Sequence, residues 1–64
     1  MTSIYVYGIL AIESILDDDF LSPADSLAAI RGVLNECLTS GPELYVDSPT
    51  DFPYISRALN PKDK

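Results

Sequence analysis

The sequence contains no histidine, no tryptophan and a single cysteine, Cys37, among its 64 residues. One thiol cannot form a disulfide within the chain, and a structural zinc site needs four clustered Cys or His ligands. A catalytic thiol needs a neighbouring base or positive charge to lower its pKa, and no histidine can serve as that base. We therefore expect no enzyme activity, no metal and no cofactor, and we expect Cys37 to be a small buried core residue.

The chain is also short of residues with which to build a core. A single domain of this size buries only about 60% of the surface that its unfolded form exposes. Small domains usually compensate with disulfides, metal ions or oligomerisation, and the first two are not expected here. The length therefore predicts a homo-oligomer or a complex with a partner. It also leaves little room for a water-excluding pocket of several hundred cubic ångströms, as enzymes usually have.

Basic residues are scarce and unevenly placed. Four Lys and Arg stand against ten Asp and Glu, which gives a formal net charge of −6, and no basic residue precedes Arg31. A typical DNA-binding site contacts about six to ten phosphates, so we expect no direct binding of nucleic acid. Negative charge on so small a body disfavours anionic membranes and favours basic partners.

The sequence lacks a long hydrophobic run. The apolar stretch of residues 4–12 is far shorter than the roughly 20 residues that a membrane-spanning helix needs. No Lys or Arg precedes this stretch and acidic residues follow it, which is not the pattern of a secretory signal. These features predict a cytoplasmic protein that does not enter a membrane.

The clearest secondary-structure signal predicts a helix over residues 23–39. Ser22 suits the N-cap, Pro23 suits the first helical position, and Asp25 completes a variant of the capping box. Gly41 can adopt the left-handed geometry that ends helices, and the next residue is a proline, which cannot continue one.

Helical spacing divides this helix into two faces. One is an apolar stripe, which we expect to form the main core of the domain: Leu27, Ile30, Leu34, Cys37 and Leu38, with Val33 at its margin. The opposite face has almost no side-chain bulk between two carboxylates: Asp25, Ala28, Ala29, Gly32 and Glu36. Gly32 costs about 1 kcal/mol relative to alanine in a helix interior. Either this face is solvated and tolerates the glycine, or the glycine lets an aromatic ring or another backbone approach closely.

The remaining elements are shorter. We expect strands over residues 3–7 and 43–47, rich in Tyr, Ile and Val, which a right-handed crossover through the main helix would join. We expect further helices over residues 9–18 and 53–59, although one stripe of apolar residues at helical spacing runs from Tyr5 to Phe20. The predicted fold is a helix-rich α+β domain of residues 1–60 with a frayed tail, residues 61–64. The alternative is an all-α domain of three helices.

The acidic residues are the main functional candidates. Asp17, Asp18 and Asp19 are consecutive, whereas a calcium loop of the EF-hand type alternates its ligands and needs a glycine at its turn. We therefore interpret them as part of a binding surface or as a solvated connection. The full predicted partner-binding set is Asp17, Asp18, Asp19, Asp25, Ala28, Ala29, Gly32, Glu36, Glu43, Asp47 and Asp51.

Two functional interpretations follow from this composition. In the first, the chain is a small acidic module that blocks or regulates a larger protein by occupying its basic or nucleic-acid-binding surface. Small virus-encoded inhibitors, including mimics of the DNA phosphate array, have a similar composition. In the second, the chain is a non-catalytic structural subunit or a self-assembling domain, and its acidity serves only solubility. Salt separates the two, because a charged interface weakens with ionic strength and an apolar one does not.

Overall fold

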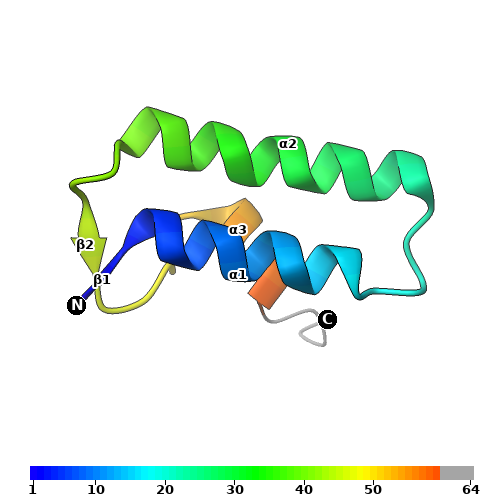
Figure 1. The fold of residues 1–64 in the computed structure, drawn as a ribbon, viewed down its shortest axis with the longest axis horizontal. Coiled ribbons are helices and arrows are strands. Elements are labelled where there is room, and N and C mark those ends of the chain that lie inside the picture. The colour runs from blue at the N-terminus through cyan, green and yellow to red at the C-terminus, as the bar shows by residue number, and fades with distance from the viewer. Residues whose placement is uncertain (60–64) are drawn as a thin grey trace.

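The computed structural model describes residues 1–59 as three helices and one short pair of strands (Figure 1). The elements in chain order are β1 (Thr2–Ser3), α1 (Ile4–Leu16), α2 (Pro23–Ser40), β2 (Tyr45–Val46) and α3 (Pro53–Leu59). Helices α1 and α2 run antiparallel, side by side, and α3 crosses behind α1 in the view of Figure 1. The predicted helix-rich α+β class is confirmed.

Helix α1 begins earlier than predicted, so the strand expected over residues 3–7 is wrong beyond Ser3. The Ser3 hydroxyl accepts a hydrogen bond from the backbone N–H of Tyr5 at 3.2 Å and caps the helix. From Ile4 onward the residues at helical spacing are buried, among them Ala11 and Ile15. Packing of this face against the rest of the domain outweighs the strand preference of the Ile, Tyr and Val side chains.

Helix α2 forms as its end signals indicate. The Ser22 hydroxyl accepts a hydrogen bond from the backbone N–H of Asp25 at 3.1 Å, and Pro23 occupies the first turn. At the other end Gly41 has a φ of 86° and its N–H donates to the carbonyl of Cys37 at 2.9 Å. A side chain at Gly41 would strain this backbone, so the glycine fixes where the helix stops.

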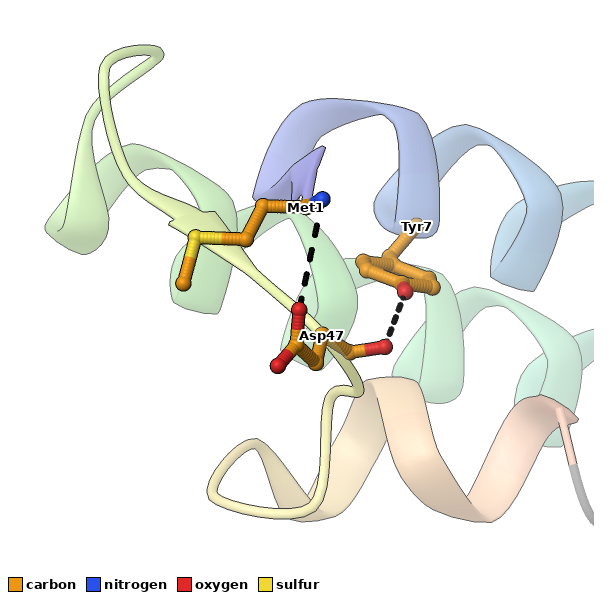
Figure 2. A network of polar contacts seen from close by, with 3 residues as sticks. All are labelled: Met1, Tyr7 and Asp47. Atoms are coloured by element: carbon orange, nitrogen blue, oxygen red, sulfur yellow. Dashed lines mark hydrogen bonds and ion pairs between the residues drawn. The ribbon is translucent and has the colours of Figure 1, made fainter.

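The strand pair closes the end of the domain opposite the α1–α2 connection. Its strands are antiparallel, with Thr2 opposite Val46 and Ser3 opposite Tyr45, so the expected crossover connection is wrong. Figure 2 shows two polar contacts that extend the pairing: the Tyr7 hydroxyl donates to the Asp47 carbonyl at 2.7 Å, and the amino group of Met1 lies 4.0 Å from Asp47 Oδ1. The second contact is exposed and adds little stability.

The core lies where the three helices meet. Among residues 1–59 six hydrophobic residues of this core are buried: Ile4, Ala11, Ile15, Val33, Cys37 and Ile55. The prediction that the apolar stripe of α2 forms the core is wrong for Leu27, Leu34 and Leu38, which are 63%, 44% and 71% exposed. The core instead uses the neighbouring face of α2, whose small residues let α1 and α3 approach. Cys37 is buried as predicted, and burial, followed by the charge of Glu36, raises the pKa of its thiol.

No helix within residues 1–59 is long and apolar enough to span a bilayer. The tail predicted for residues 61–64 lies outside the described residues.

Candidate protein-binding surfaces

The face of α2 with little side-chain bulk is where α3 docks. A Cβ atom at Gly32 would collide with the ring of Tyr54, so the ring lies directly on the α2 backbone. Of the two interpretations of this face, close approach of an aromatic ring is therefore the one that the structure confirms. The docked ring holds α3 against α2, and α3 in turn brings Ile55 into the core.

Glu36 completes the docking of α3. Its Oε2 accepts a hydrogen bond from the backbone N–H of Tyr54 at 3.0 Å, and its Oε1 accepts one from the backbone N–H of Ile55 at 3.1 Å. These N–H groups belong to the first turn of α3 and have no partner within the helix. A carboxylate at this end also interacts favourably with the helix dipole. Gly32 and Glu36, both in the predicted binding set, thus hold α3 in place.

A groove opens beside the docked helix, at the end of the domain where α1 connects to α2. Its volume is about 640 Å³. The lining comes from all three helices and the connection: Ser14, Ile15, Asp17, Asp18, Leu21, Asp25, Ala28, Ala29, Tyr54, Arg57 and Ala58. Ala28 and Ala29 of α2 have small side chains here, which leaves space between α2 and α3.

Charge in the groove is predominantly negative. Among residues 1–59 the lining has three carboxylates, Asp17, Asp18 and Asp25, and one cation, Arg57, which gives these residues a formal charge of −2. Within residues 1–59 none of these four side chains forms an ion pair, although Asp18 Oδ1 accepts a hydrogen bond from the backbone N–H of Phe20 at 2.9 Å. The carboxylates of Asp17 and Asp25 are therefore available to a partner.

The groove reaches the several hundred cubic ångströms for which the chain length predicted little room in a water-excluding pocket. The groove is nevertheless open to solvent, because Asp17, Asp25, Ala28, Tyr54 and Arg57 are all exposed. Within the described residues no group of three or more His, Cys, Asp or Glu side chains could hold a metal ion. The groove is therefore a solvent-open surface with apolar walls and an acidic edge.

The structure brings together five of the predicted binding residues in the groove: Asp17, Asp18, Asp25, Ala28 and Ala29. Asp19 lies in the same connection but does not line the groove. Glu43, Asp47 and Asp51 lie at the other end of the molecule, around β2 and the turn before α3 (Figure 1). The acidic surface thus consists of two separate clusters.

Sequence analysis did not identify the α3 side of the groove. Tyr54, Arg57 and Ala58 are spaced at i, i+3 and i+4 of the helix that was predicted over residues 53–59. Such spacing places side chains on one face of a helix. That signal was available in the sequence, but nothing in it indicated that this face would meet the alanines of α2.

A second surface lies on the side of α1 and α2 that faces away from α3. Ser14 of α1 and Gly32 of α2 contact α3. Successive residues of a helix are rotated by about 100°, so Leu16 and Leu34, two positions later, point away from α3. Large aliphatic side chains occupy this opposite side. We call the exposed ones the aliphatic face: Ile9, Leu16, Leu27, Leu34 and Leu38. Figure 1 is viewed from this side, and no element is drawn in front of it.

Comparison of the chain with protein-family models, with curated proteins and with solved structures gives no match. Its function therefore has to be argued from these two surfaces.

Proposed function

We propose that this protein is a small binding module whose groove takes a basic, partly apolar segment of a larger protein and thereby blocks or regulates that protein. The observation that supports this most directly is the groove of about 640 Å³ with apolar walls and three carboxylates against one arginine. Lys or Arg side chains of the segment would meet Asp17 and Asp25 at the edge. Its apolar side chains would contact the alanines and Tyr54.

The positions of the acidic residues support binding of a protein segment in the groove rather than mimicry of the phosphates of DNA. A mimic of DNA needs carboxylates in a continuous row that matches successive phosphates. Among residues 1–59 most acidic residues form two clusters at opposite ends of the molecule, whereas Glu13 lies on α1 and Glu36 caps α3. The proposal therefore rests on one local surface, and a cytoplasmic setting, where Cys37 stays reduced, belongs to it.

Two matched peptides and two matched double variants test this proposal. The probes are amphipathic peptides of equal length built from Leu and Lys or from Leu and Glu, with binding followed by fluorescence anisotropy. Asp17→Asn with Asp25→Asn changes the groove, whereas Glu43→Gln with Asp51→Asn makes the same change in net charge at the other end. We expect the Leu–Lys peptide to bind the parent, and the groove variant to weaken it by about tenfold or more.

The control variant should change the affinity by about twofold at most, because distant charges are screened at physiological salt. Ala28→Met adds a third arm, since it fills the groove without changing charge and should also weaken binding. Equal weakening by the two double variants, or equal binding of the two peptides, would contradict the proposal. Thermal melts of all variants confirm that the fold is retained.

A further inference from the structure

The aliphatic face lies on the side of α1 and α2 away from α3, so it is separate from the groove. Among residues 1–59 eleven large hydrophobic side chains are exposed whereas only six residues are buried in the core. Five of the eleven form the aliphatic face, and Ile12 and Ile30 lie half-buried on the same two helices. Continuous apolar surface of this kind marks an interface in soluble proteins.

Two observations indicate what covers the face. The first is the pair of charged residues at its edges, Glu13 on α1 and Arg31 on α2. Both side chains are exposed, and neither forms a hydrogen bond or ion pair within the described residues. Gly8 lies against Val33 and Cys37. Gly8 is thus level with about residue 35 of α2. Because the two helices run antiparallel, Glu13, five residues further along α1, is level with about residue 30 and so within about one residue of Arg31.

A second copy of the chain complements this arrangement. In a two-fold dimer that places α1 of one copy over α2 of the other, each Glu13 meets Arg31 of the second copy, and the contact occurs twice. The aliphatic side chains between them meet their counterparts with no ionised group in the middle. The carboxylates responsible for the net charge of −6 lie mostly at the two ends, away from this contact.

The second observation is size. The broad side of the molecule, which Figure 1 shows, measures 32 by 21 Å between Cα atoms. A standard interface takes about 800 Å² of accessible surface from each partner. Two full-length helices side by side can supply that area, whereas the seven-residue α3 alone could not.

We propose that the aliphatic face binds the same face of a second copy, with α1 against α2 and Glu13 paired to Arg31 across a two-fold axis. This leaves both grooves free on the outer sides of the dimer, because α3 lies on the other side of the helix pair. The dimer would therefore be bivalent toward a basic partner.

Sedimentation over a concentration series, from about 1 to 500 μM at physiological salt, measures the dimer directly. Leu34→Gln should weaken dimerisation by about tenfold or more. Leu10→Gln is the matched control, since Leu10 is equally exposed, at 45% against 44%, but lies on the Ser14 side of α1. A parent that stays monomeric throughout, or a control that weakens the dimer as much as Leu34→Gln, would overturn the proposal.

Charge reversal tests the orientation. Glu13→Arg and Arg31→Glu should each weaken the dimer, because each places like charges opposite one another. The chain that carries both substitutions should recover most of the affinity, since it restores both pairs. Failure of the double variant to recover would overturn the pairing of α1 with α2. Circular dichroism of each variant separates loss of association from loss of fold. These substitutions leave the groove intact, so their outcome is independent of the peptide experiment.

Discussion

The two sides of the α1–α2 pair are built on different principles. On the side that α3 covers, α2 presents Gly32, which lies under the Tyr54 ring, and Glu36, which caps α3. The uncovered side carries the large aliphatic side chains. Helix packing in this domain thus depends on close backbone approach and leaves these bulky residues exposed.

This contrast reverses a common expectation about amphipathic helices. The face with the largest hydrophobic side chains usually points into the core. Here α2 has too few partners among the described residues to bury both faces, since residues 1–59 supply only α1 and α3 as further helices. The face on which α3 docks is decided by shape and by specific hydrogen bonds rather than by hydrophobicity alone.

Truncation on the two sides gives the largest expected difference. Ile55→Ala removes a fully buried side chain and should lower the free energy of unfolding by about 2–5 kcal/mol. Leu27→Ala removes a side chain that is 63% exposed and should cost less than about 1 kcal/mol in dilute, monomeric protein. Urea unfolding followed by circular dichroism measures both.

Ile55→Ala could unfold so small a domain entirely, so Ile55→Val gives a graded version with an expected cost of about 0.5–1.5 kcal/mol. Equal losses for Ile55→Ala and Leu27→Ala would show that the covered and uncovered sides do not differ in packing.

A double-mutant cycle tests the close contact between α1 and α2. A Cβ at Gly8 would collide with the Cys37 sulfur, so Gly8→Ala should cost about 1–3 kcal/mol despite the better helix propensity of alanine. In the Cys37→Ala background the nearest neighbours of that Cβ lie at 3.7 and 3.9 Å, which is ordinary contact. The double variant should then recover much of the loss, with a coupling of about 0.5–3 kcal/mol. Additive losses would contradict the contact.

The sequence was most informative where a single residue carries a local constraint. Ser22 and Gly41 predicted the ends of α2 because capping depends on a few adjacent atoms. The helix over Pro53–Leu59 was also predicted, and the lone cysteine on the apolar stripe was expected to be buried, as it is. The glycine in the middle of α2 indicated a close approach, without identifying Tyr54 as the ring.

Long-range packing accounts for what the sequence did not reveal. The strand preference of residues 4–7 is overridden by burial of Ile4 and Gly8 against α2. The apolar stripe of α2 gave no indication that α3 would pack on the opposite face, which carries Gly32 and Glu36. The groove depends on this choice too, because Asp17, Asp25 and Tyr54 come together only after α3 docks.

Glu36 is the next test of the covered side. Glu36→Ala removes both hydrogen bonds to the first turn of α3 and should lower stability by about 0.5–2 kcal/mol. Glu36→Gln keeps one acceptor oxygen and should lie between the parent and the alanine variant. Glu43→Ala, at an exposed position without such contacts, is the control for loss of one negative charge. If Glu43→Ala costs as much as Glu36→Ala, the cap contributes nothing.

The smallest expected effect concerns the thiol at the centre of the covered side. Burial, and then the charge of Glu36, raise the pKa of Cys37, so the folded protein holds the thiol proton more tightly than the unfolded chain does. The resulting contribution to stability is present below the ordinary thiol pKa and is lost as the pH rises through the raised value. Unfolding free energies measured between about pH 7 and pH 10 should therefore fall more steeply for the parent than for Cys37→Ala. Every other residue is the same in the two proteins, so the difference between the two curves isolates the thiol. Alkylation by iodoacetamide gives an independent measure, because the buried thiol should react more slowly in native buffer than in urea. Equal rates would mean that α1 does not cover Cys37, and the distinction between a packed side and an open side of the helix pair would fail at its centre.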